Sequence, residues 1–253
     1  MQDDSALDRA VAMVKDLRIR CAWDRVQTRD TLRPYLIEEA HELDAALASG
    51  ESAAIRDEVA DFLLHLAWQL VLGQEAGEFT PDDIADDLVA KMRRRHPQLF
   101  ELGPQEEWQA LKTRERKRQH GTLDGLPATL PDLLMAYRLQ ERAAGVGFDW
   151  PDASGPIGKV REELAEVEHE LASSDASATD KLADEIGDLL FAVVNLARKA
   201  DVHPGPALDR ANRKFRERFE QVERLAEQRG IDMETAGLDT LDVLRDEVKR
   251  TPR

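Results

Sequence analysis

Hydrophobic residues recur every three or four positions along most of the chain, which is the spacing of amphipathic helices. Thr80-Pro81 adds a strong helix start, with a capping threonine and a proline in the first position. In the first half the pattern predicts helices over residues 5–20, from about Thr31 to Gly50, over 52–76, from Pro81 to before Pro97, and over 105–119.

The second half repeats this order after residues 120–127, HGTLDGLP, which we interpret as the linker. The predicted helices start near Pro131, form a pair within residues 159–191, start again near Pro206, and end with one over about 232–250. No segment shows the alternation typical of a strand. We therefore expect an all-α protein of two tandem four-helix units, residues 1–122 and 123–253.

Acidic residues in the helix pair of the second half follow the helical repeat. Glu163 and Glu166 are three residues apart, as are Glu185 and Asp188, so each pair lies on one helix face. The intervening ASSDASATD is typical of a turn, and two antiparallel helices would bring the four carboxylates together. Such a cluster repels itself and is costly to desolvate, whereas Mg²⁺ takes oxygen ligands. The pattern predicts a magnesium site.

The same acidic pattern occurs in the first half, at Glu39, Glu42, Glu58 and Asp61. Acidic residues are also common in first turns and on solvated faces, so a single pattern of this kind says little. Two copies in matching frames form an internal repeat, which the solvated-face explanation does not account for. The segment after Asp61, FLLHLAWQLVL, is apolar nearly all round, so we expect that helix to be buried.

Basic residues also recur at equivalent places. Lys214 and Arg218 share a helix face, as do Lys91 and Arg95 in the first half. In an acidic chain, cations at the same place in each repeat suit an anionic ligand such as a phosphate. Pairing with neighbouring glutamates on a solvated face is the alternative explanation.

The charge balance restricts the partners of the chain. Its 253 residues hold 35 Lys and Arg against 51 Asp and Glu, a net charge of −16, which argues against a nucleic-acid duplex or an anionic membrane surface. Cys21 is the only cysteine, so neither an internal disulfide nor a cysteine zinc site is possible. No apolar run is long enough to span a bilayer, and the first residues resemble no signal peptide. We expect a cytoplasmic protein.

Two other classes stay open. A di-iron redox bundle would use paired Glu-x-x-His motifs, but the two present, ending at His41 and His169, are out of frame between the copies. A non-catalytic interaction module is the second class.

His65 follows Asp61 by one turn, but we interpret it as a core histidine. Trp23 and Trp150 precede the acidic helix pairs and are either core anchors or base-stacking residues.

The segments WDRVQT, PYLIEEAHEL, RRHPQLF, VGFDW and DEIGDLLFAVVNLAR resemble the MazG nucleotide pyrophosphohydrolases over nearly the whole chain. The resemblance implies Mg²⁺-dependent hydrolysis of nucleoside triphosphates to monophosphate and pyrophosphate. It implies metal ligands at Glu163, Glu166, Glu185 and Asp188, with Glu39, Glu42, Glu58 and Asp61 in the first copy. It implies triphosphate contacts at Lys159, Glu162, Lys181, Asp184, Lys214 and Arg218, and Asn212 as a further candidate.

The two copies differ in these contacts. Tyr35, Ala54 and Val89 stand where the second copy has Lys159, Lys181 and Asn212. Losing two cations weakens triphosphate binding, so we expect the C-terminal copy to be the main active site. Glu162 or Asp184 is the candidate to orient the attacking water or to act as its base. A single bundle leaves its acidic face open and so forms only one side of a binding pocket. We therefore expect a homodimer, in which a second copy supplies the other side.

Overall fold

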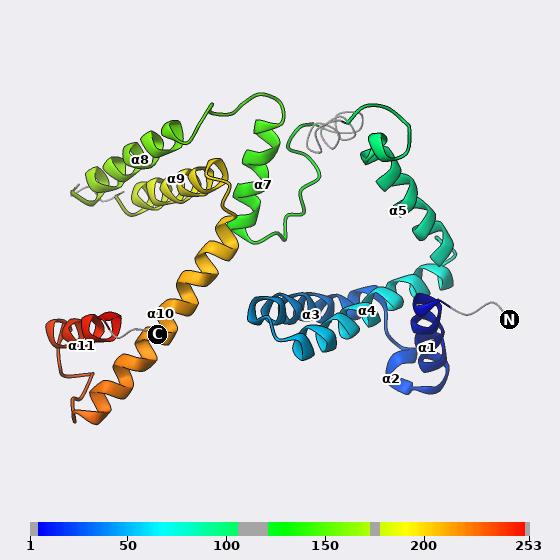
Figure 1. The fold of residues 1–253 in the computed structure, drawn as a ribbon, viewed down its shortest axis with the longest axis horizontal. Coiled ribbons are helices and arrows are strands. Elements are labelled where there is room, and N and C mark those ends of the chain that lie inside the picture. The colour runs from blue at the N-terminus through cyan, green and yellow to red at the C-terminus, as the bar shows by residue number, and fades with distance from the viewer. Residues whose placement is uncertain (1–4, 106–120, 173–177, 251–253) are drawn as a thin grey trace. The chain divides into compact units, whose positions relative to one another are not determined.

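The computed structural model describes residues 5–105, 121–172 and 178–250, whose helices are shown in Figure 1. The chain forms two compact units, Met1–Glu106 and Glu107–Arg253. All regular secondary structure in the described ranges is helical, which confirms the all-α class. The helix predicted over 105–119 and the middle of the ASSDASATD turn lie outside the described residues, and the domain boundary after residue 122 stays a prediction.

Side-chain caps start the main helices of the N-terminal unit. Ser5, Thr28 and Thr80 each accept a hydrogen bond from the backbone three residues on, which satisfies an otherwise unpaired amide. Thr28 starts the second long helix two residues earlier than we predicted, and the expected loop RCAWDRVQT contains one short helix. The elements are α1 (Ala6–Arg20), α2 (Ala22–Arg25), α3 (Arg29–Ser49), α4 (Ser52–Glu75), α5 (Pro81–Arg95) and η1 (Pro97–Leu99).

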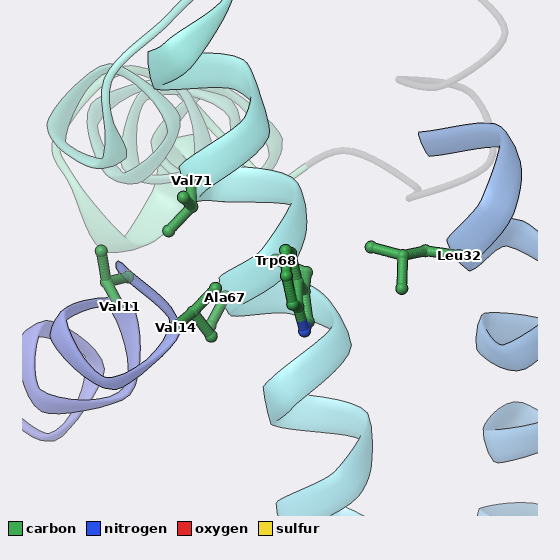
Figure 2. Close-up of a cluster of buried hydrophobic side chains, with 6 residues drawn as sticks. All are labelled: Val11, Val14, Leu32, Ala67, Trp68 and Val71. Carbon is green, nitrogen blue, oxygen red and sulfur yellow. The ribbon is translucent and has the colours of Figure 1, made fainter. Parts of the chain in front are cut away.

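The core of the N-terminal unit lies where α1 and α3 meet the second half of α4 (Figure 2). Its buried side chains are Val11, Val14, Leu32, Ala67, Trp68 and Val71. The middle of α4 is different, since Leu66 is 47% exposed and Leu64 is also exposed. The expectation that all of α4 after Asp61 is buried is therefore wrong for this chain by itself, because α1 covers only the far end of the helix.

The C-terminal unit is built on an antiparallel pair, α8 and α9, against which α7 packs (Figure 1). Its helices are α7 (Asp132–Ala144), α8 (Ser154–Ala172), α9 (Ala178–Lys199), α10 (Pro204–Gln228) and α11 (Leu238–Arg250). A small core of Val222, Ala226 and Leu244 joins α10 to α11. The last helix starts at Leu238, later than predicted, because Asp232 accepts hydrogen bonds from the backbone of Glu234 and the hydroxyl of Thr235 and holds a turn there.

Apolar side chains are exposed on both acidic hairpins. On α3 and α4 they include Ile37 and Val59, and on α8 and α9 they include Leu164 and Leu190. Among the described residues, no helix combines the length and the apolar character needed to cross a lipid bilayer. These apolar faces are uncovered in the single chain.

Candidate metal centres

Three carboxylates of the C-terminal unit converge between α8 and α9. Oxygen atoms of Glu163, Glu185 and Asp188 all lie within 4.8 Å of one another. Glu163 is only 4% exposed, whereas the other two lie nearer the surface. The helical spacing places Glu185 and Asp188 on one face of α9, and the antiparallel packing brings Glu163 of α8 to that face.

Glu166, the predicted fourth ligand, lies beside this group rather than within it. Its pKa is raised by burial, by a hydrogen bond with Glu163, and by the negative charges of Glu163 and Glu185. Neighbouring negative charges favour the protonated form of a carboxyl group. A bound cation would act in the opposite direction and favour the ionised form. Glu166 therefore shares the electrostatic environment of the cluster.

Lys159 supplies a positive charge to the C-terminal cluster from within α8. Its ammonium group pairs with Glu163 and lies 3.0 Å from Oε1 of Glu162. These two hydrogen bonds raise the pKa of Lys159, so the side chain stays charged at neutral pH. The residue that we predicted to contact phosphate thus already lies at the carboxylates predicted to hold the metal.

The other predicted residues of the second copy divide into two groups. Lys181 and Asp184 are exposed in the first turns of α9, shortly before Glu185. Asn212, Lys214 and Arg218 are on α10, which packs against α7 and α11 and runs away from the α8–α9 pair (Figure 1). Among the described residues, no hydrogen bond or ion pair joins these three residues to the carboxylate cluster, because α10 continues past the base of the pair.

The N-terminal unit repeats the cluster on α3 and α4. Oxygen atoms of Glu39, Glu58 and Asp61 lie within 4.8 Å of one another. Burial raises the pKa of Glu39 and of Glu58, and the neighbouring carboxylates, including Glu42, raise both further. No Lys or Arg in the described part of the chain pairs with Glu39 or Glu58, since Tyr35 stands in the place of Lys159. This cluster lacks an internal countercharge.

His65 is buried next to the N-terminal cluster, with 6% of its surface exposed. Its Nε2 is 3.9 Å from Oε1 of Glu39, and burial lowers its pKa. Nδ1 of His65 and Oε2 of Glu39 are buried and have no hydrogen-bond partner among the described residues. The histidine is a core residue, as we interpreted it, but its Nδ1 is not satisfied among the described residues. In the second copy Ala192 takes its place.

The donor sets of both clusters fit a hard divalent cation. Each offers carboxylate oxygens from two helices at short mutual distance, and such cations take carboxylate oxygen ligands. Burial first, and then the negative charge of neighbouring carboxylates, raises the pKa of Glu39, Glu58 and Glu166, so ionisation of these groups is unfavourable without a cation. A divalent ion would offset that repulsion, and Oε2 of Glu39 is an orphaned acceptor that it would satisfy.

A cavity of about 750 Å³ adjoins the C-terminal cluster. Lys159, Glu163 and Asp188 line it together with Trp150 and Gln140. Sequence reasoning missed Gln140, although a signal was present: it lies one turn after Ala136 and Tyr137 of α7, where the helical repeat predicts a buried position. A polar residue at a buried position of an amphipathic helix indicates a polar partner.

Comparison with known proteins agrees with these clusters. Residues 27–100 and 157–223, which carry them, match the MazG nucleotide pyrophosphohydrolase domain. The chain is 38% identical to the nucleoside triphosphate pyrophosphohydrolase of Escherichia coli K12 over 96% of its length and 97% of that protein. It is 38% identical to the nucleoside triphosphate pyrophosphohydrolase/pyrophosphatase MazG of Thermotoga maritima, over 88% of this chain and 86% of that protein. The chain belongs to the MazG nucleotide pyrophosphohydrolase family.

Proposed function

We propose that this protein hydrolyses nucleoside triphosphates, NTPs or dNTPs, to nucleoside monophosphate and pyrophosphate, with Mg²⁺, as part of nucleotide-pool housekeeping. The observation that carries the proposal is the ammonium group of Lys159 beside the cluster of Glu163, Glu185 and Asp188. A divalent cation and a lysine at one place match the charge of a triphosphate. The printed names of the Escherichia coli and Thermotoga maritima relatives support the same reaction.

The residues of the C-terminal unit have distinct roles in this reaction. Glu163, Glu166, Glu185 and Asp188 would hold Mg²⁺, which supplies charge neutralisation of the phosphates and activates water. Lys159 leaves its pairing with Glu163 and binds triphosphate oxygens, where it offsets the charge that develops on the pyrophosphate leaving group.

Hydrolysis breaks the anhydride bond between the α- and β-phosphates. Water adds its oxygen to one phosphate and gives up a proton, and the bridging oxygen leaves with the other. Glu162 and Asp184 are the two carboxylates next to the metal-binding residues along α8 and α9 that are not themselves in the cluster, so either accepts that proton or orients the water.

The C-terminal copy carries most of the activity in this proposal. Its cluster has Lys159 and an adjoining cavity, whereas the N-terminal cluster has Tyr35 at the equivalent position. Both copies retain the carboxylates, so metal binding is expected at both. The N-terminal copy is then a weaker or structural site.

A homodimer completes the proposal. The apolar side chains exposed on the hairpins, such as Leu66 and Leu190, suit burial against a second copy. A second copy would also cover the open side of each acidic face. Light scattering is expected to give twice the mass of one chain, and a fully active monomer would contradict this part of the proposal.

Product analysis tests the reaction. The purified chain is incubated with a mixture of NTPs and dNTPs, with Mg²⁺ or with EDTA, and nucleotides and phosphates are separated by chromatography. Monophosphate and pyrophosphate formed only with Mg²⁺ are expected. Diphosphate and phosphate would overturn the assigned bond, and activity that persists in EDTA would overturn the metal.

A further inference from the structure

The cavity beside the C-terminal cluster has a lining of two chemical kinds. Lys159, Glu163 and Asp188 are its charged cluster residues, beside which the proposed function places the triphosphate. Phe148 and Trp150 also line the cavity, and most of the lining surface is apolar. Small-molecule sites commonly have volumes of about 300–1,000 Å³ with apolar walls and a few polar groups, and the 750 Å³ here lies within that range.

Gln140 places one unsatisfied acceptor in this wall. The side chain is 7% exposed, and its Nε2 donates a hydrogen bond of 2.8 Å to the backbone oxygen of Phe191. That bond fixes the amide between α7 and α9. Its Oε1 is buried and has no hydrogen-bond partner among the described residues. A buried acceptor without a partner is unfavourable, so this atom indicates a ligand that brings an N–H or O–H donor.

Trp150 is held in place on the same cavity while 45% of its surface stays exposed. Its indole ring lies against Gly155 in the first turn of α8, so closely that a side chain there would collide with it. The preceding residue, Asp149, pairs with Arg198 and with Lys199 at the end of α9. An exposed aromatic ring on a fixed loop is suited to stack on a flat ligand.

The loop is anchored further by the amide of Asn195. Its Oδ1 accepts hydrogen bonds from Arg198, 3.1 Å from Nε and 2.8 Å from Nη2. Arg198 therefore joins Asp149 on the loop to Asn195 within α9, and all three residues line the cavity. The position of the aromatic ring relative to the carboxylate cluster is thus fixed by α9, which carries Glu185 and Asp188.

We propose that this cavity is the nucleobase subsite, in which Trp150 stacks on the base and Oε1 of Gln140 accepts a hydrogen bond from a base N–H. The inference rests on the proposed function for the position of the triphosphate. Every natural base offers a flat π face and at least one N–H donor, and stacking on an aromatic side chain contributes about 1–3 kcal/mol per base. A purely hydrocarbon occupant would leave the Gln140 acceptor unsatisfied.

The test measures what the base adds to recognition. For ATP, GTP, CTP and UTP, kcat/KM is divided by kcat/KM for ribose 5-triphosphate, which has no base. We expect a ratio well above one for at least one nucleotide in the wild type. Trp150→Leu and Gln140→Leu are each expected to lower that ratio about tenfold. Trp23→Leu is the matched control, since Trp23 holds the corresponding place before the acidic hairpin of the N-terminal unit, and it is expected to leave the ratio unchanged.

A binding measurement keeps the inference separate from the proposed reaction. Isothermal titration of the full chain in Mg²⁺ with the four nucleoside monophosphates and with ribose 5-phosphate is expected to show at least tenfold tighter binding of one monophosphate, and both variants are expected to lose this preference. Equal binding of ribose 5-phosphate, or a preference that both variants keep while circular dichroism shows them folded, would overturn the subsite. Absence of turnover together with a base preference that both variants lose would instead overturn the reaction and support the subsite.

Discussion

Replacing Lys159 by methionine separates its ion pairing in the structure from its proposed role in binding the triphosphate. In the metal-free protein Lys159 neutralises the buried carboxylate of Glu163 and also pairs with Glu162. The lysine side chain is 43% exposed, so we discount the pair for solvent screening and expect its loss to cost about 1 kcal/mol of stability. For a chain of this size that corresponds to a fall in Tm of about 2–4 °C.

The effect on Mg²⁺ binding has the opposite sign. In the wild type, a cation that binds Glu163 must displace the ammonium group, and in the variant it need not. The same ~1 kcal/mol therefore appears as about fivefold tighter Mg²⁺ binding. Activity nevertheless falls, by about 100-fold, because removing one preorganised charge that stabilises the transition state typically costs that much.

Three measurements check this prediction. Thermal unfolding in EDTA gives the stability, isothermal titration gives the Mg²⁺ affinity, and pyrophosphate release gives the activity. Arg161→Met is the matched control, because Arg161 is also on α8 and no ion pair among the described residues joins it to the cluster. Weaker Mg²⁺ binding in Lys159→Met, or the same destabilisation in Arg161→Met, would refute the reasoning.

Three further predictions follow from the clusters and the loop. Glu185→Ala should reduce pyrophosphate release more than 100-fold while Glu58→Ala keeps at least a third of it, and equal losses would contradict a dominant C-terminal site. Because the folded pKa of Glu39 is raised above 4.5, its ionisation costs stability as pH rises through that range; metal-free Glu39→Gln should match the wild type near pH 4 and exceed it at pH 7 in urea unfolding. The pKa of Asp149 is lowered, chiefly by Arg198, so Asp149→Asn should cost about 2 kcal/mol at pH 7, and the difference should vanish as pH falls below 3.8.

The helices could be predicted because their signals are local. Capping residues such as Thr80 and the helical repeat of apolar residues act within a few positions, and both are visible in the sequence. The three-residue spacing likewise predicted that carboxylates of the two helices converge, because a helix fixes their face, but Glu166 lies beside the group of Glu163, Glu185 and Asp188. The late start of α11 was missed because a turn held by Asp232 competes with the helical pattern there.

Features that depend on packing between distant segments could not be predicted in the same way. The orphaned acceptor of Gln140 exists because α7 lies against α9 and its amide nitrogen is taken by Phe191, 51 residues further along the chain. The pairing of Lys159 with Glu163 was available from their spacing of four residues, but its consequence for metal binding depends on the burial of Glu163. The unsatisfied histidine beside Glu39 also became visible only when α3 and α4 were placed together.

The close approach of Trp150 to Gly155 restricts how this family can vary. A ring at position 150 requires that position 155 carry only a hydrogen atom, because a Cβ there would overlap the indole. A relative that has a small residue at position 150 loses this requirement and is free to carry a side chain at 155. The two positions should therefore covary among MazG sequences, and a change at both would reshape the wall of the cavity without altering any carboxylate of the cluster.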